Sequence, residues 1–208
     1  SMMKSRVGDD CPIIGVVMSP FSVPVMQMGF GAYLDLIMEQ PELFARLIRI
    51  NADFCVTWAN AQLEAGATAI CYFDPVSSPT IIPRDIFIRT GHEIACDTLK
   101  RINGPPAIHL ASGRVLPIME DLIRTGAAVV GVSCIESLAE LKRVSRGRIG
   151  LLGNLNGIEM RRWSAAETES RVRAAIAEGA PGGGFILADN HGEIPWAVPD
   201  ETLMAIAD

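Results

Sequence analysis

The sequence predicts an α/β fold built from consecutive strand–helix units whose strands run parallel. Six short apolar runs alternate with longer stretches that have helical spacing. The short runs are bounded by Gly, Pro, Asp or Ser, which is typical of parallel strands buried on both faces. Three tetrapeptides that end in Gly-Ala, at residues 64–67, 124–127 and 177–180, each close a helical stretch just before a strand. A repeated strand–helix pattern of this kind predicts right-handed crossovers.

The strands are expected at the apolar runs. Each run is a few residues long and contains almost no charge, so it would be buried between two layers. In chain order the predicted strands are residues 13–18, 69–73, 107–110, 128–132, 149–152 and 185–187.

The helices are expected between these runs. Apolar residues spaced three, four and seven apart form one stripe on the first long helix. Shorter stripes of the same kind occur twice more, and three prolines suit first helical positions. The long stripe comprises Phe44, Leu47, Ile48, Cys55 and Trp58, the short ones Leu116, Met119 and Ile123, and Val172, Ala175 and Ile176; the prolines are Pro41, Pro83 and Pro199.

Capping signals mark the ends of these helices. Ser137 with Glu140, and Ser164 with Glu167, have the spacing of a capping box. A glycine that closes a helix can adopt the left-handed conformation without a clash, which is expected at Gly66, Gly126 and Gly179. The run 182–184 is interpreted as a flexible connector, because it precedes a strand instead of opening a helix.

Composition bounds the function. The 208 residues carry a net charge of −6, with 49% hydrophobic and 20% charged residues. This balance argues against a nucleic-acid binder and a disordered chain, and no apolar run is long enough to cross a membrane. Five cysteines without a CxxC pair indicate reduced thiols in a cytoplasmic protein. Ser1, ahead of two methionines, is interpreted as a cloning remnant.

Two architectures accommodate this pattern, a (β/α)₈ barrel and an open doubly wound sheet. No GxGxxG follows the first strand, which disfavours a dinucleotide-binding sheet. A barrel needs eight strands, whereas only six are evident, so either two strands are unrecognised in the sequence or the chain forms an incomplete barrel. Residues 1–11 are assigned to a tag remnant and N-terminal segment, and residues 12–208 to a single domain.

Polar residues follow the strands, where parallel α/β folds place their functional groups. The candidates for substrate contact or acid–base chemistry are Asp74, Ser77 and Ser78, His109 and Arg114, Cys134 and Glu136, Asn154, and Asp189 and His191.

The two histidines allow two kinds of chemistry. With Cys134 or a carboxylate such as Glu136, His109 and His191 could bind zinc; alternatively they could transfer protons. Arg114 suits a substrate carboxylate or phosphate. The alternatives without chemistry are that both histidines are hydrogen-bonded within the fold, that Cys134 is a buried apolar residue, and that Asp74 only closes a turn.

Several segments together carry a family resemblance. Residues 107–113, 122–130 and 153–156, then 184–187 through His191-Gly192 to Pro199, resemble the uroporphyrinogen decarboxylase superfamily, which includes cobalamin-dependent methyltransferases. The resemblance implies a TIM-type barrel and implies that this chain begins after the first two strand–helix units.

The two branches of that family imply different sites. The decarboxylase branch is metal-free, binds a tetrapyrrole, and carries an Arg-rich N-terminal motif that is absent here. The methyltransferase branch implies zinc bound by His-x-Cys and a distant Cys, which activates a thiol to attack a corrinoid-bound methyl group. His109 matches the first ligand, but Ala111 and His191 stand where the two cysteines would be.

The resemblance therefore implies three readings. The first is a methyltransferase-like protein that uses a corrinoid such as methylcobalamin, either free or bound to a partner corrinoid protein. This reading includes the zinc site as an option. The second is a decarboxylase-like enzyme in which His191 and Asp74 contact a tetrapyrrole. The third is a catalytically silent barrel fragment acting through a partner chain. A homodimer is expected, because an open barrel exposes strand edges.

Overall fold

The computed structural model describes residues 2–207, so Ser1 lies outside the described residues, as does Asp208. Six parallel strands form one sheet in the order β1-β2-β3-β4-β5-β6. All six predicted strands are confirmed, with ends that differ by at most three residues. They are β1 (Ile14–Met18), β2 (Ala69–Phe73), β3 (Pro106–His109), β4 (Val129–Gly131), β5 (Gly150–Leu155) and β6 (Phe185–Asp189).

Helices connect every pair of neighbouring strands. The α-helices are α1 (Met2–Val7), α2 (Val23–Met28), α3 (Phe30–Glu39), α4 (Pro41–Glu64), α5 (Arg84–Phe87), α6 (Glu93–Leu99), α7 (Met119–Arg124), α8 (Leu138–Ser145), α9 (Ala165–Gly179) and α10 (Asp200–Ala207). The short helical turns are η1 (Pro75–Ser77), the π-helical η2 (Ile88–His92), η3 (Leu116–Ile118) and η4 (Glu159–Arg162).

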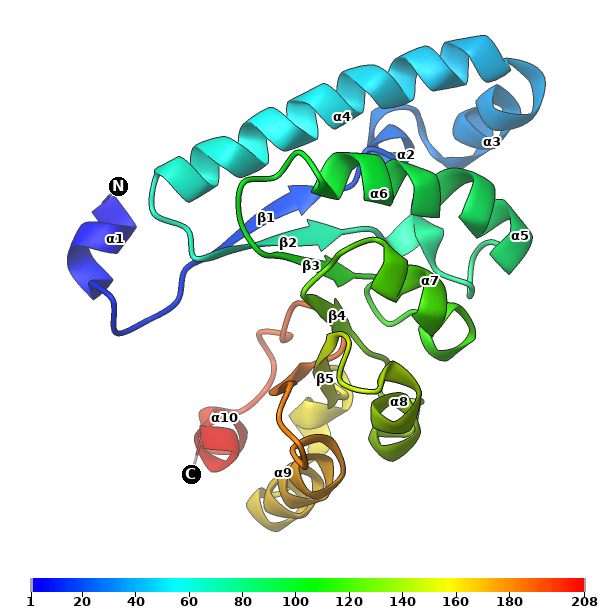
Figure 1. Ribbon diagram of the computed structural model, residues 1–208. Coiled ribbons are helices and arrows are strands. Elements are labelled where there is room, and N and C mark those ends of the chain that lie inside the picture. Colours follow the sequence, from blue (N-terminus) through cyan, green and yellow to red (C-terminus); the bar gives the residue numbers. More distant parts are fainter. Residues whose placement is uncertain (1, 208) are drawn as a thin grey trace.

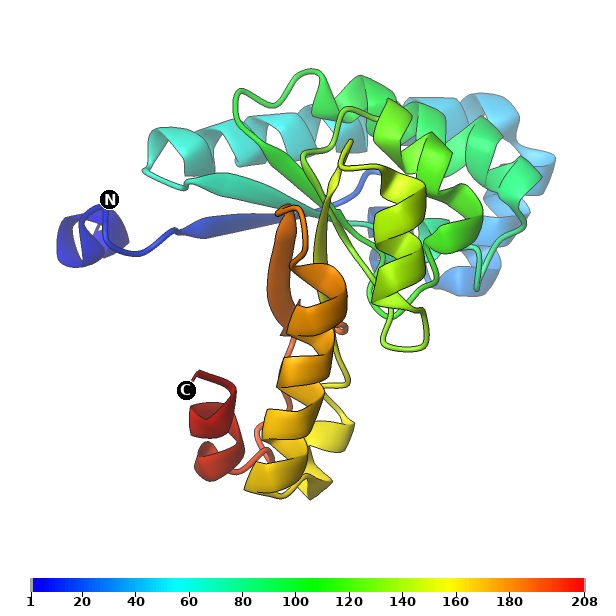
Figure 2. The same ribbon diagram turned by 60° about the horizontal axis from the view of Figure 1, so that its bottom comes forward.

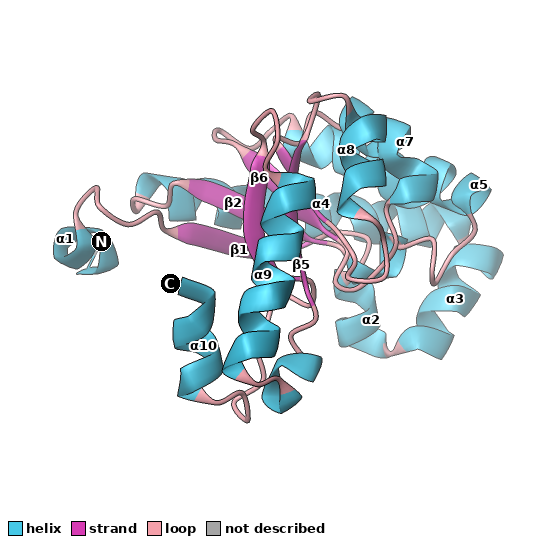
Figure 3. Cartoon of the chain, turned by 90° about the horizontal axis from the view of Figure 1, so that it is seen from below, coloured by secondary structure: helices cyan, strands magenta, loops and turns pink. Residues whose placement is uncertain are grey.

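The sheet is curled, and its helices lie on the outer side. Figure 1 shows α4 and α6 over β1–β3, and α8 and α9 beside β4 and β5. Turning the molecule shows β6 at a steep angle to β1 (Figure 2). Seen from below, the strands lie at the centre with α4, α7, α8 and α9 around them (Figure 3), and the strand order leaves β1 and β6 unpaired with each other, which is the arrangement of an open barrel. Among residues 2–207, no strand pairs with the outer edge of β1 or of β6.

The main core lies between the strands and the outer helices. Ile70, Ile108, Val130 and Leu151, from four adjacent strands, are each 2% exposed or less. A second, smaller cluster joins Phe21, Tyr33, Leu36 and Val76 beneath α3. This cluster packs the loop after β1 against the loop after β2, so it fixes the two loops at the carboxyl ends of these strands.

The long helix α4 begins at Pro41 as predicted, but its buried face differs from the predicted stripe. Trp58, expected on the buried face, is 52% exposed. Cys55 is buried as expected, and the residues buried with it are Asn51, Val56 and Ala59. The face of α4 that packs on the molecule is therefore rotated away from Trp58 relative to the predicted stripe.

The glycine predictions are confirmed at two of three helix ends. Gly66 and Gly126 have φ values of +105° and +81°. Gly179 is the last residue of α9 and has no positive φ, so the prediction of a left-handed cap there is wrong. The glycine instead allows α9 to pack closely on β6, because a Cβ at Gly179 would lie 2.7 Å from the Phe185 ring. The connector at residues 182–184 is confirmed as three consecutive positive-φ glycines.

Both predicted capping residues act as expected. The Ser137 hydroxyl accepts the Glu140 amide at 3.3 Å, and the Ser164 hydroxyl accepts the Glu167 amide at 3.2 Å. Within residues 2–207, no helix is both long enough and apolar enough to span a membrane.

Candidate functional site

A cavity of about 630 Å³ opens at the carboxyl ends of the central and last strands. The loops after β2, β3, β4 and β6 all contribute to it, as expected for a parallel α/β fold. Its polar lining consists of Thr80, Ser112, Arg114, Ser133, Asn190 and His191; Cys134 and Ile135 form another part of the wall.

Asp74 lies beside this region in a cluster of hydroxyl groups. It is 2% exposed, and its carboxylate accepts hydrogen bonds from Ser19 (2.5 Å), Ser22 (2.6 Å) and Ser77 (2.6 Å). Burial raises the pKa of Asp74, and the hydroxyl donors oppose this rise. The carboxylate thus joins the loop after β1 to the loop after β2.

His109 ends β3 in a closely packed slot. It is 3% exposed, its ring lies 5.7 Å from the Phe73 ring, and a Cβ at Gly131 would collide with it. Its Nδ1 accepts the amide of Ala111 at 3.1 Å, so a neutral ring carries its proton on Nε2. Burial lowers the pKa of His109, which favours that neutral form.

The turn after β6 presents His191 to the cavity. The Asp189 carboxylate accepts the amides of His191 (2.7 Å) and Gly192 (3.0 Å), so it shapes the turn. The His191 ring is half-buried, and its Nδ1 is buried with no hydrogen-bond partner among residues 2–207. The neighbouring Asn190 is fully buried, and neither its Nδ2 nor its Oδ1 has a partner within the same residues.

Two other candidate residues stabilise the loop after β4. The Glu136 carboxylate accepts the amides of Val115 and Leu116, the latter at 2.8 Å. The Asn154 amide donates to the carbonyls of Ser133 and Glu136, each at 3.0 Å. These contacts hold Cys134 at the cavity wall, where burial raises the pKa of its thiol.

The remaining candidates surround the loop after β2. Ser77 binds Asp74, and the Ser78 hydroxyl accepts the Thr80 amide at 3.1 Å. The Thr80 hydroxyl in turn accepts the backbone amide of Arg114 at 3.4 Å. The Arg114 side chain is exposed and lines the cavity.

The residues present do not fit a tetrahedral zinc site. Zinc takes four nitrogen, sulfur or oxygen ligands. The Nδ1 lone pair of His109 is engaged by Ala111, and the Glu136 carboxylate is engaged by two amides. Over residues 2–207, no three His, Cys, Asp or Glu side chains lie close enough together to hold a metal ion.

The structure thus gathers three of the ten candidates, Arg114, Cys134 and His191, on one cavity wall. Asp74, Ser77, Ser78, His109, Glu136, Asn154 and Asp189 do not line it, and the contacts above show what else each does. Their substrate and metal roles stay predictions. Sequence reasoning missed Asn190 as a site residue; its position between Asp189 and His191 after the last strand was the available signal.

The comparisons with known proteins agree with this geometry. The family model described as uroporphyrinogen decarboxylase (URO-D) matches residues 1–208. Methylcobamide:CoM methyltransferase MtaA from Methanosarcina barkeri is 28% identical over 156 residues, covering 74% of this chain and 46% of that protein. Uroporphyrinogen decarboxylase from Acinetobacter baumannii is 27% identical over 218 residues, covering 96% of this chain and 59% of that protein.

A solved structure supports the fold. A methyltransferase from Methanosarcina mazei superposes with a TM-score of 0.86 and 25% identity, over 99% of this chain and 60% of that one. The chain therefore spans about half to three-fifths of the length of these relatives. The prediction of an incomplete barrel with six strand–helix units is confirmed.

Proposed function

This chain belongs to the uroporphyrinogen decarboxylase (URO-D) family, and we propose that it acts in methyl transfer between a corrinoid and a thiol. The observation that carries the proposal is the TM-score of 0.86 to a methyltransferase over 99% of the chain. The similarity to a methylcobamide:CoM methyltransferase points to the same chemistry. Transfer would take place at the cavity lined by Arg114, Cys134 and His191.

The side chains at the cavity suggest how the acceptor is handled. A methylated corrinoid, free or on a partner corrinoid protein, supplies a methyl group on cobalt and retains the electron pair of the broken cobalt–carbon bond. The guanidinium of Arg114 would hold an anionic group of the thiol acceptor. The half-buried imidazole of His191, which lines the cavity, would accept the thiol proton, so that sulfur forms its bond to carbon as a thiolate.

The other candidates would position these groups. Asp74 and Ser77 fix the loop that carries Thr80, and Asp189 shapes the turn that carries His191. His109 stands behind that turn, where a Cβ at Gly192 would lie 3.5 Å from its ring. Because the donor set does not fit zinc, thiol activation rests on His191 in this proposal. The cysteines, all unpaired, suit a reducing compartment such as the cytoplasm.

The test measures the loss of methylcobalamin absorbance with coenzyme M (CoM) as the thiol. We expect demethylation that requires both the chain and the thiol and that is lost in His191→Ala. His92→Ala is the matched control, because His92 contacts the Asp121 carbonyl away from the cavity. A rate equal to that of thiol and methylcobalamin alone would contradict the proposal.

One observation favours a second function, tetrapyrrole decarboxylation. The match to uroporphyrinogen decarboxylase covers 96% of this chain, against 74% for the methyltransferase MtaA. In that case His191 and Asp74 would contact a tetrapyrrole, and no metal would be needed. Incubation with uroporphyrinogen distinguishes the two functions, because release of CO₂ without methyl transfer would favour the decarboxylase.

A further inference from the structure

The cavity at the strand ends has two chemically different polar regions. One is the exposed guanidinium of Arg114. The other is the turn after β6, where Asn190 and His191 are adjacent. Among the described residues that line the cavity, none is an aspartate or glutamate. The cavity therefore favours an anionic ligand, because a guanidinium binds an oxyanion through paired hydrogen bonds.

Asn190 is a buried polar side chain in this region that lacks hydrogen-bond partners. Its exposure is 0%, and neither its amide nitrogen nor its amide oxygen has a partner among residues 2–207. Buried side-chain amides are nearly always hydrogen-bonded, so an amide with both atoms unmatched calls for a partner. The Asp189 carboxylate does not serve, because it accepts the amides of His191 and Gly192.

Two neighbouring hydroxyl groups are already engaged. The Ser133 hydroxyl donates to the Ser112 carbonyl at 2.9 Å, and the Thr80 hydroxyl accepts the Arg114 amide at 3.4 Å. Asn190 thus lies at the cavity wall with an amide donor and an amide acceptor side by side, neither of which has a hydrogen-bond partner at standard geometry among residues 2–207. Its side chain lies near the Cys134 thiol and opposes the rise that burial causes in the pKa of that thiol.

We propose that this cavity binds a small organic anion carrying a carboxamide-type group, with the amide at Asn190 and the anionic oxygen at Arg114. A carboxamide presents one acceptor and one donor on the same edge, which matches both Asn190 atoms in a single orientation. Because Asn190 is closed off from solvent, this contact requires its side chain to turn toward the cavity. The inference goes beyond the proposed function, because it names a second ligand class for the same cavity, one that would compete with the thiol acceptor for Arg114.

Three simple compounds test the two contacts on the unmodified chain. Succinamate carries both a carboxamide and a carboxylate, succinamide lacks the anion, and succinate lacks the amide. Binding is followed by titration calorimetry, with no corrinoid and no thiol present. We expect saturable binding of succinamate that is about tenfold or more tighter than that of either analogue. Equal affinities for the three compounds, or no saturable binding of succinamate, would overturn the proposal.

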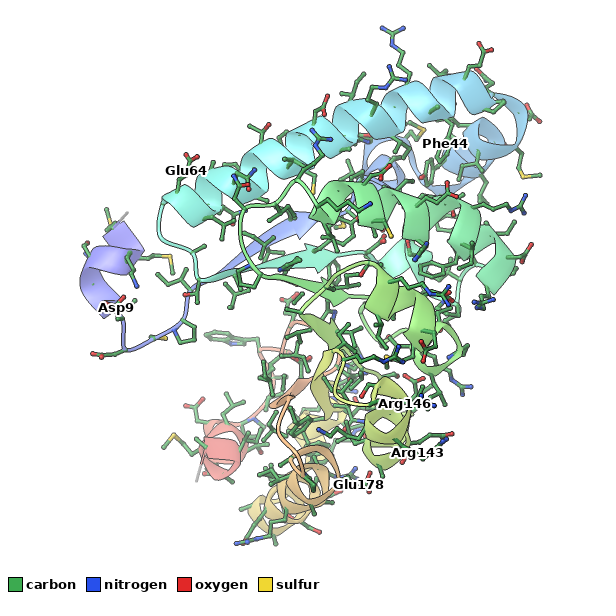
Figure 4. All side chains as sticks on the ribbon, viewed as in Figure 1. Asp9, Phe44, Glu64, Arg143, Arg146 and Glu178 are labelled. Atoms are coloured by element: carbon green, nitrogen blue, oxygen red, sulfur yellow. The ribbon has the colours of Figure 1, made fainter. Side chains whose placement is uncertain are left out.

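Variants assign the contacts. Arg114→Gln and Asn190→Ala should each weaken succinamate binding about tenfold. Arg143→Gln is the matched control, because Arg143 lies on the outer side of α8 (Figure 4) with its side chain 73% exposed. Unchanged affinity in Asn190→Ala would place the amide contact elsewhere and contradict the proposal.

Thermal unfolding separates a ligand-binding asparagine from a structural one. With no partner for its amide, Asn190→Ala should unfold at the same temperature as the unmodified chain or higher. A clear fall in the unfolding temperature would indicate that the amide is satisfied within the fold, for example by a buried water. Failure of these binding tests leaves the methyl-transfer assay untouched, so the two proposals can fail separately.

Discussion

At the scale of single residues, buried polar side chains define the site more than exposed ones do. Asp74 and His109 are both nearly inaccessible, and each is matched by groups of its own chain. Asn190 is equally buried and has no match among residues 2–207. The sequence predicted Asp74 and His109 as candidates from their places at strand ends, but it could not show which buried side chains lack partners, because that depends on contacts distant in the sequence.

The raised pKa of Asp74 predicts a pH-dependent stability. Its folded pKa exceeds the unfolded value. Between about pH 4 and the folded pKa, the folded chain therefore keeps a proton that the unfolded chain has released. The free energy of unfolding of the unmodified chain, relative to Asp74→Asn, should therefore fall as the pH rises through this window and then level off. Urea unfolding over a pH series checks this, and a relative stability that rises with pH would contradict it.

The Ala111 contact predicts the tautomer of His109. Nitrogen NMR of the ring should report a neutral imidazole protonated on Nε2, titrating below the ordinary histidine pKa because burial disfavours the charged ring. The depressed pKa gives stability that is present above about pH 6.5 and is lost as the pH falls. His109→Gln should lack that dependence. A ring protonated on Nδ1 would reopen the question of metal binding through Nε2.

At the scale of elements, apolar runs and caps predicted the framework well. The strands were recognisable because a buried parallel strand needs almost continuous apolar residues, and the caps because Ser137 and Ser164 act within their own turns. The buried face of α4 was harder to predict. Trp58 is exposed and Ala59 buried, because the face that packs is set by contacts with elements distant in the sequence and not by the local apolar spacing.

Close packing of α9 on β6 predicts a strong effect at Gly179. A Cβ there would lie 2.7 Å from the Phe185 ring, so Gly179→Ala should lower the free energy of unfolding by about 1–3 kcal/mol. Gly31→Ala on α3 is the control; it meets no atom within 4 Å and should leave stability unchanged or slightly higher. Equal effects of the two substitutions in chemical denaturation would refute the packing role of Gly179.

At the scale of the whole molecule, the open sheet leaves apolar strand residues accessible. Ile14 and Val16 of β1 are 52% and 55% exposed, and Ile186 of β6 is 51% exposed. The outer edge of β1 is partly covered, because the Gln62 side chain donates to the carbonyl of Val16 and accepts its amide. Exposed apolar strands at a sheet edge favour association with another chain.

We therefore predict a reversible homodimer formed through β1 and β6. Sedimentation velocity at increasing concentration should show it, and Val16→Lys should raise its dissociation constant about tenfold or more. Met38→Lys is the control, since Met38 is equally apolar and 80% exposed but lies on α3. A chain that stays monomeric at every concentration, or that responds alike to both substitutions, would contradict this interface.

The most direct test of the account follows a deuterated methyl group from methylcobalamin to coenzyme M by mass spectrometry. The account predicts labelled methyl-coenzyme M with the unmodified chain and with Arg143→Gln, and a rate about tenfold or more lower with Arg114→Gln. Transfer that is equally fast in all three proteins would place the reaction away from this cavity. The absence of labelled product with the unmodified chain would contradict methyl transfer by this chain.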